Sequence, residues 1–138
     1  TIKEKMIELF KNMSLVTHQF VVTQEVYKAF QICSGDMNPL HTDLEFAKSK
    51  GFPECVMYGN IINAFVSTLI GMCLPSPDVI IHSQDIQYKK PVFMNDVLDA
   101  EIRVEEVFES VNTVELKFTF RNQYSQVVSK GHVQIGVI

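Results

Sequence analysis

The residues of this chain that are best suited to chemistry are an aspartate and a histidine, which lie five positions apart in the stretch SGDMNPLHTD, residues 34–43. The imidazole of His41 can exchange a proton near neutral pH, and the carboxylate of Asp36 can orient a water molecule and help to deprotonate it. The pair also has a structural explanation, in which Asp36 supports a turn and His41 is a hydrogen-bonded core residue.

The stretch that carries this pair is predicted to be a rigid loop. Gly35 allows backbone conformations that other residues avoid, and Pro39 fixes its own φ while it pushes Asn38 towards extended geometry. A continuous helix or a central strand is therefore excluded here. We expect Asp36 and His41 to be held in place, as catalytic groups on a scaffold are.

The residues around the pair are a more specific signal of function than the spacing of Asp36 and His41. The string SGDMNPLHTDLEFAKSKGF, residues 34–52, resembles the hydratase signature of the MaoC-like (R)-specific enoyl-CoA hydratases, which are hot-dog-fold proteins. The resemblance continues through VMYG at 56–59, an apolar helix that contains Ser67, and KPVF at 90–93. It extends from about Phe20 to the C-terminus.

This resemblance implies a role for individual residues. Asp36 and His41 match the catalytic dyad, and the backbone amide of Gly59 matches the group that stabilises the enolate oxygen. A glycine at a helix start also has a simpler explanation in backbone freedom, but a helix N-terminus does present free N–H groups and a positive dipole end.

Four further residues are expected to lie against the substrate: Ser34, Asn38, Tyr58 and Ser67. Asn38 is expected to fix the loop, although its position before Pro39 is also that of an ordinary turn residue. Ser67 matches a pocket serine of the family, or it could bond to its own helix backbone. Tyr58 departs from the family pattern, in which many relatives have histidine, and the pocket shape or preferred acyl group is expected to differ.

Metal and redox chemistry are less well supported. His41 and Asp43 form an HxD pair without a further cluster of metal-ligand residues, so we expect no metal. Cys33, Cys55 and Cys73 are odd in number and widely spaced, which fits neither a disulfide framework nor a CxxC zinc site. We expect free, buried thiols, with Cys33 close enough to Asp36 to line its pocket. His18, His82 and His132 are expected to be surface or sheet residues.

The elements that must position the loop alternate in type along the first half of the chain. Apolar residues at helical spacing predict a short amphipathic helix over 2–10, and a short strand is expected over 18–22. Thr23 is a predicted N-cap for a helix up to Cys33, and this helix leads into the loop. Asp43 is a predicted N-cap for a brief helix that stops at Gly51. The long apolar run 59–73 predicts a helix that other structure must wrap, ended by the prolines that follow it.

The second half of the chain changes to a period of two. Segments 79–90, 98–104, 114–120 and 127–137 are predicted to be half-buried antiparallel strands with one face towards solvent. A sheet with one dry face and one very apolar helix are best combined by curling the sheet around the helix. The predicted fold is therefore α+β, and the resemblance names it a hot-dog fold: a single domain over 1–138, with a curled antiparallel sheet around a long central helix.

Composition excludes several other classes of protein. The chain is 46% hydrophobic and 20% charged, as globular proteins are, and its net charge of −4 with dispersed basic residues argues against nucleic acid as a partner. No stretch approaches a membrane span, and the charged N-terminus does not resemble a signal peptide. We expect no membrane association and a cytoplasmic location.

The expected activity is that of an enoyl-thioester hydratase: reversible addition of water to a trans-2-enoyl-CoA, or to the equivalent acyl-carrier-protein thioester, giving the (R)-3-hydroxyacyl thioester of fatty acid metabolism without a cofactor. Two alternatives remain open, a hot-dog acyl thioesterase and a non-catalytic acyl-thioester-binding protein. Because one short sheet leaves an unpaired edge and covers only part of the central helix, a homodimer or higher homo-oligomer with a shared active site is expected.

Overall fold

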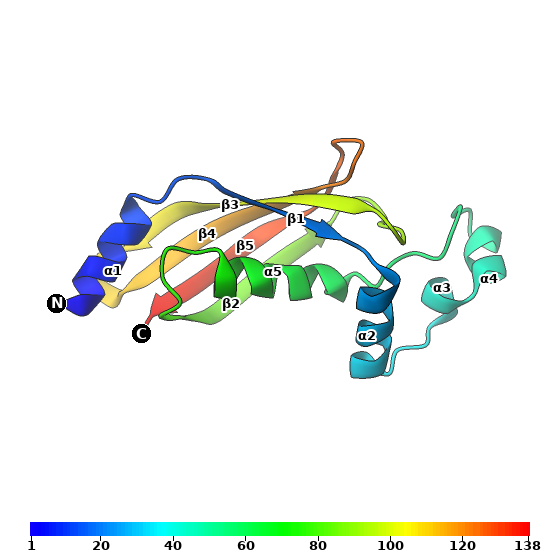
Figure 1. Ribbon diagram of the computed structural model, residues 1–138, viewed down its shortest axis with the longest axis horizontal. Helices are drawn as coiled ribbons and strands as arrows, with labels where there is room; N and C mark the ends of the chain where they lie inside the picture. The colour runs from blue at the N-terminus through cyan, green and yellow to red at the C-terminus, as the bar shows by residue number, and fades with distance from the viewer.

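The computed structural model describes residues 1–138 and contains one five-stranded antiparallel sheet and five α-helices. In chain order the elements are α1 (Ile2–Lys11), β1 (Val16–Val21), α2 (Gln24–Ser34), α3 (Pro39–Thr42), α4 (Leu44–Ser49), α5 (Asn60–Met72), β2 (Val79–Tyr88), β3 (Val97–Phe108), the 3-10 turn η1 (Glu109–Val111), β4 (Thr113–Arg121) and β5 (Val127–Val137). The strand order is β1-β3-β4-β5-β2 (Figure 1). The α+β hot-dog prediction is confirmed.

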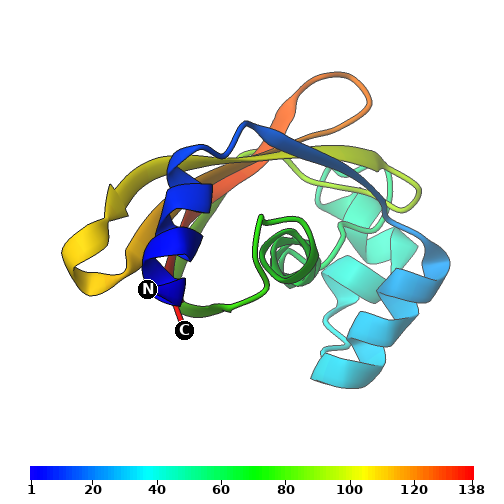
Figure 2. The ribbon, with the colours of Figure 1, turned by 60° about the vertical axis from the view of Figure 1, so that its left-hand side comes forward.

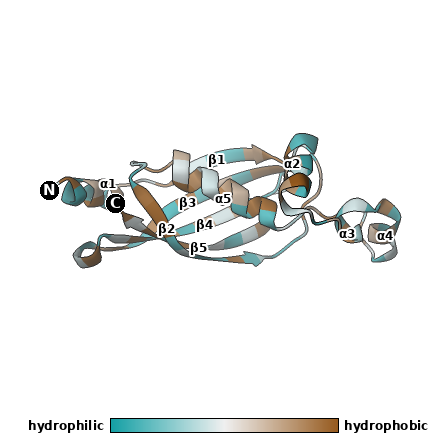
Figure 3. Ribbon diagram, turned by 90° about the horizontal axis from the view of Figure 1, so that it is seen from below, coloured by the Kyte–Doolittle hydropathy of each residue, from teal (hydrophilic) through white to brown (hydrophobic).

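The sheet curls around α5, which Figure 2 shows end-on inside the curve. Six α5 side chains are buried against it: Ile61, Ile62, Phe65, Val66, Leu69 and Ile70. The sheet covers only part of this helix, as expected, and one strip is left uncovered. Asn60, Ala64, Ser67 and Gly71 are exposed on the face of α5 that Figure 3 shows uncovered from below. These residues recur at helical spacing, so they form a continuous bare stripe.

The period of two is clearest in β4, where buried and half-buried residues alternate from Val114 to Arg121. The inward side chains Leu116, Phe118 and Phe120 are fully buried in the core, whereas the outward ones are charged or hydroxylated. The prediction of a half-buried strand is wrong for β2. That strand is at the edge of the sheet, most of its residues are exposed, and Ile80 and Ile81 remain 53% and 39% exposed.

The amphipathic helix α1 lies at the end of the sheet that is remote from α2 (Figure 1). A capping box starts it, because the Thr1 hydroxyl accepts from the Glu4 amide while the Glu4 carboxylate accepts from the N-terminal amino group. Its buried residues Ile7 and Phe10 join the main core, and the helix packs against β3 and β5. The predicted amphipathic helix is confirmed.

The helices α2, α3 and α4 lie at the opposite end of the sheet, and α3 and α4 project beyond it (Figure 1). Each helix begins at a predicted or recognisable cap: Thr23 accepts from the Val26 amide, Asn38 from the Leu40 amide, and Asp43 from the Phe46 amide. Gly35 ends α2 with φ +69°, in the left-handed region that favours glycine. The predicted loop therefore contains one helical turn, α3, that begins at Pro39.

The three cysteines are free, as expected, but the prediction that they are buried is wrong. Cys33 is exposed and Cys55 and Cys73 are half-buried, and Cys33 does not line the cavity near Asp36. His18, His82 and His132 lie on strands, as expected. No helix of the chain has the length and apolar character needed to cross a membrane.

Candidate active site

Most of the residues singled out in the sequence meet around one cavity of 330 Å³ at the N-terminal end of α5. It is lined by Phe30, Ser34, Asp36, His41, Tyr58, Gly59, Asn60 and Tyr88. The lining comes from the end of α2, the loop, the start of α5 and the end of β2. The fold thus brings an acid, an imidazole and a helix N-terminus together from segments that are far apart in sequence.

His41 is oriented by the backbone. Its ring nitrogen Nδ1 lies 2.6 Å from the carbonyl oxygen of Val56. A carbonyl can only accept, so Nδ1 carries the hydrogen and Nε2 of the neutral ring carries the lone pair. The ring also stacks on Tyr58, with centroids 4.2 Å apart and planes inclined by 29°. His41 is therefore fixed in the tautomer in which Nε2 can accept a proton.

Asp36 is held at two atoms of its backbone and by one carboxylate oxygen. Its amide donates to the Ser34 hydroxyl, and its Oδ1 accepts from the Asn38 amide. Its own carbonyl accepts from the hydroxyl of Tyr58. The second carboxylate oxygen has no hydrogen-bond partner within the chain, so it is available to a water molecule or a ligand in the cavity.

Two tyrosines fix this loop to the rest of the molecule. Tyr58 is only 2% exposed and packs against Phe30 and Tyr27 as well as His41. Tyr27 donates from its hydroxyl towards the carbonyls of His41 (2.6 Å) and Val56 (3.2 Å). Burial raises the pKa of Tyr27 well above its ordinary value, so this phenol stays a neutral donor.

Gly59 caps the N-terminus of α5 without a side-chain hydrogen bond. The amide of Ile61 donates to the Tyr58 carbonyl and that of Ile62 to the Gly59 carbonyl, but the amides of Gly59 and Asn60 have no acceptor within the chain. Both residues line the cavity. Free amides at a helix N-terminus attract negative charge, so an oxyanion would be stabilised here.

Tyr88 is a site residue that the sequence did not predict. A Cβ added to Gly59 would lie 3.0 Å from its ring, so the aromatic face covers the start of α5 closely. Burial raises the pKa of the Tyr88 phenol. Its position at the end of an alternating strand was visible in the sequence, but nothing there indicated that the strand ends over Gly59.

A second cavity of 370 Å³ shares three residues with the first, namely His41, Gly59 and Tyr88. The remainder of its lining is Phe52, Val56, Met57, Ile62, Lys89, Lys90, Pro91 and Val92. The KPVF segment therefore contributes three of its four residues to this cavity. His41 lies between a polar cavity and a more apolar one, an arrangement that suits a ligand with an apolar chain.

Two of the predicted residues do not line the cavity. Asn38 acts in the loop, where its side chain caps α3. Ser67 lies on the bare stripe of α5 and makes no hydrogen bond within the chain. No three His, Cys, Asp or Glu side chains of the chain converge as metal ligands would.

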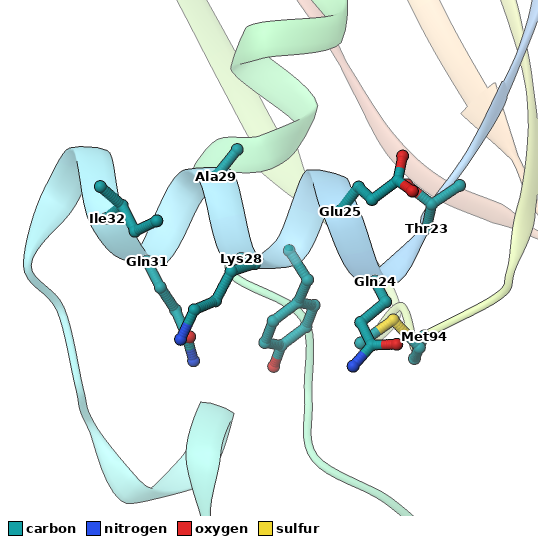
Figure 4. A pocket seen from close by; sticks show the side chains of 9 residues that line it. Thr23, Gln24, Glu25, Lys28, Ala29, Gln31, Ile32 and Met94 are labelled. Atoms are coloured by element: carbon teal, nitrogen blue, oxygen red, sulfur yellow. The ribbon is translucent and has the colours of Figure 1, made fainter.

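The largest cavity, of 880 Å³, is a groove along α2 and contains neither Asp36 nor His41. Figure 4 shows Gln24, Lys28 and Gln31 on the same side of α2 as Met94. Tyr27 also contributes to its lining. Size alone would select this groove, but it lacks the acid, imidazole and free amides that the smaller cavity combines.

The fold and the site define a class: hot-dog proteins in which an Asp/His pair meets the N-terminus of the central helix. Comparison with protein families matches residues 9–123 to the MaoC like domain. The chain belongs to this family, and the resemblance seen in the sequence is confirmed.

Relatives of known description agree with the family. The chain is 37% identical over 76 residues to an (R)-specific enoyl-CoA hydratase of Aeromonas caviae, an alignment that covers 55% of this chain and 57% of the relative. It is 28% identical over 114 residues to a mitochondrial 3-hydroxyacyl-[acyl-carrier-protein] dehydratase of Arabidopsis thaliana, covering 80% of this chain and 68% of the relative. The alignments with the other curated relatives cover half or less of those proteins.

Solved structures give a similar result over more of the chain. The (R)-hydratase of A. caviae superposes with a TM-score of 0.84 at 26% identity, covering 91% of this chain and 95% of that one. An R-hydratase of Pseudomonas aeruginosa superposes with a TM-score of 0.82 at 27% identity, covering 90% of this chain and 79% of that one.

Proposed function

We propose that this protein is an enoyl-thioester hydratase, which adds water reversibly to a trans-2-enoyl thioester and yields the (R)-3-hydroxyacyl thioester. The observation that carries the proposal is that Asp36, His41 and the free amides at the start of α5 line one cavity. The names of its relatives, hydratases and dehydratases of CoA and acyl-carrier-protein thioesters, support the same class of reaction.

In this mechanism Asp36 and His41 act on one water. The free carboxylate oxygen of Asp36 orients the water, and Nε2 of His41 accepts its proton while the oxygen attacks C3 of the enoyl group. The electrons move through the double bond to the thioester oxygen, and the Gly59 amide stabilises the resulting enolate. The proton held on Nε2 of His41 is then delivered to C2, so that one water is added in total and His41 returns to its neutral form. The thioester serves as the electron sink, so the reaction is expected to need no cofactor.

Tyr58, Ser34 and Asn38 act indirectly in this proposal. The Tyr58 hydroxyl, the Ser34 hydroxyl and the Asn38 amide each bond to Asp36, so they fix the position of its carboxylate. Tyr58 also covers one face of the His41 ring. A tyrosine at position 58, where the family pattern has histidine in many members, is therefore consistent with an altered pocket shape.

We further propose that the working unit is a homodimer with a shared site. Edge strand β2 and the bare stripe of α5 are both uncovered, and Ser67 lies on that stripe. A second copy that pairs at β2 would cover both surfaces, and the α5 stripes of the two chains would then face each other. In that assembly Ser67 could contact substrate, although it lies outside the cavity of a single chain.

The test is hydration of crotonyl-CoA, followed as loss of the conjugated enoyl absorbance. Asp36→Asn and His41→Ala are each expected to lower kcat by at least ~10²-fold, as for the loss of a positioned proton-transfer group. The double variant should be little worse than either, because the two groups act as a unit. Asp99→Asn, on an exposed strand position remote from the cavity, is the matched control. Ordinary turnover by Asp36→Asn would contradict the assignment.

A parallel assay for free thiol separates the alternatives. A thioesterase would release CoA from crotonyl-CoA or from a saturated acyl-CoA, whereas a hydratase consumes the enoyl group and leaves the thioester intact. A non-catalytic binding protein would change neither signal.

A further inference from the structure

A group of five cations on the outer face of the sheet has no role in the proposed reaction. We call it the outer cationic cluster; it consists of Lys89, Arg103, Lys117, Arg121 and Lys130. The five side chains line a concavity of 580 Å³ together with Leu15, Glu101, Thr119 and Val127. They account for five of the twelve basic residues in a chain of net charge −4.

The strand register explains why these side chains converge on Thr119. Lys117 and Arg121 precede and follow Thr119 by two positions on β4, so the three share the outer face. Lys130 of β5 is directly opposite Thr119, and Arg103 of β3 is directly opposite Lys117. Like charges at directly opposed positions destabilise a sheet, so this arrangement lowers the stability of the fold when no ligand is bound.

Neighbouring acids offset this destabilisation only at Arg121. Arg121 lies 3.7 Å from Glu101, but the other four cations have no carboxylate within salt-bridge distance. On the same face, by contrast, His132 lies between Asp85 and Glu105, at 3.3 and 3.2 Å. The sheet therefore pairs charges around His132 and leaves four of the five cations in the neighbouring concavity without a salt bridge. An anion with several negative charges would relieve the repulsion.

The concavity adjoins the candidate active site at the end of β2. Tyr88 points inward, where it packs on Gly59, and the next residue, Lys89, belongs to the alternate face. Lys89 lines both the outer concavity and the 370 Å³ cavity that contains His41. A single extended ligand could therefore reach from the outer concavity past Lys89 to His41.

We propose that the outer cationic cluster binds the phosphates of a CoA thioester whose acyl group lies in the cavity of Asp36 and His41. This assignment rests on the proposed hydratase function. A small phosphorylated ligand suits the site better than a protein does, because the cations are confined to one concavity formed by β3, β4, β5 and the residue after β2, whereas a stable protein partner covers about 800 Å². Arginine and lysine are the side chains that bind phosphate groups most often.

The first test compares crotonyl-CoA with crotonyl-pantetheine, which lacks the whole 3′-phospho-ADP group that carries the phosphates. For the double variant Arg103→Gln/Lys117→Gln, the ratio of kcat/KM for crotonyl-CoA to that for crotonyl-pantetheine is expected to fall about five- to tenfold, as for two exposed charge-assisted contacts. Lys3→Gln/Lys5→Gln on α1 has the same net charge and should keep the wild-type ratio. An unchanged ratio in the cluster variant would overturn the proposal.

The second test does not depend on turnover. Calorimetric titration with 3′-phospho-ADP should show binding to the wild type that the cluster variant loses and the α1 variant keeps. If neither thioester is hydrated, the hydratase proposal fails while this titration still decides the phosphate site. A chain that prefers a crotonyl-acyl-carrier protein to crotonyl-CoA, and loses that preference in the cluster variant, would overturn the CoA assignment. Because the variant removes like charges, it should unfold no more easily than the wild type.

Discussion

Tyr58→Phe isolates one hydrogen bond that we infer to position the Asp36 carboxylate, which we propose to be catalytic. The substitution removes only the hydroxyl, which donates to the Asp36 carbonyl. The ring contacts with His41, Phe30 and Tyr27, at centroid separations of 4.2, 4.8 and 5.2 Å, can all remain. Any effect on activity would then come from the freedom gained by the loop around Asp36.

The expected loss of stability is modest. A partly buried hydrogen bond contributes about 0.5–1.5 kcal/mol to the free energy of unfolding, and the Asp36 carbonyl can bond to water instead, since Asp36 is exposed. For a chain of this length, that corresponds to a decrease in Tm of about 2–6 °C. The expected loss in kcat is larger, about tenfold, because misplacing a catalytic group by less than 1 Å is costly.

The assay combines thermal unfolding with crotonyl-CoA kinetics. Tyr124→Phe is the control, because Tyr124 is 74% exposed and its hydroxyl makes no hydrogen bond within the chain. The positioning role predicts a fall in kcat with KM little changed. If Tyr58→Phe loses stability but keeps the wild-type kcat, the hydroxyl supports the fold only and the reasoning about Asp36 is refuted.

Two further substitutions test how the scaffold holds the site. Gly131→Ala should destabilise the protein by several kcal/mol, or prevent folding, because a Cβ there would overlap the backbone carbonyl of Asp85 and the ring of Phe118. The free energy of unfolding is measured by chemical denaturation. Gly71→Ala is the control, because a Cβ at Gly71 would contact no other atom. Asn38→Ala should cost about 1 kcal/mol through loss of the α3 cap, whereas Asn38→Asp should keep the cap, and equal melting temperatures for the two would contradict this role.

Much of the fold was accessible from the sequence because the local signals agree. The caps at Thr23 and Asp43, the left-handed Gly35 and the alternation along β4 each act within a few residues, so their patterns survive without tertiary information. The extent of wrapping around α5 was not accessible. Apolar residues on most sides predicted a helix that one sheet covers only in part, but they did not show that the uncovered stripe runs through Ala64 and Ser67.

The residues of the candidate site could also be predicted only in part. The motif identified Asp36 and His41, and the helix start identified Gly59, as residues that could act together. It could not identify Tyr27, whose hydroxyl reaches the carbonyls of His41 and Val56, 14 and 29 positions away. A backbone carbonyl is offered by every residue type, so a contact of this kind leaves no pattern at the accepting positions. Tyr88 was missed because its packing on Gly59 depends on where β2 ends over α5.

The exposed edge strand provides the last prediction. Ile81 is opposite Ile135 in the β2–β5 register and so belongs to the inner face, yet it is 39% exposed because α5 does not cover it. An apolar residue on an unpaired edge favours pairing with a second chain, and a lysine on such an edge opposes it. In the proposed homodimer, the same pairing also covers the bare stripe of α5.

Ile81→Lys is therefore expected to convert a dimer into a monomer in sedimentation velocity, and to lower crotonyl-CoA hydration by an amount that follows the dimer fraction. Val111→Lys is the matched control, because Val111 is 65% exposed in the turn between β3 and β4 and should tolerate the charge. Circular dichroism confirms that both variants are folded. A wild type that sediments as a monomer while fully active would refute the shared site, since Asp36 and His41 would then suffice with the residues of one chain.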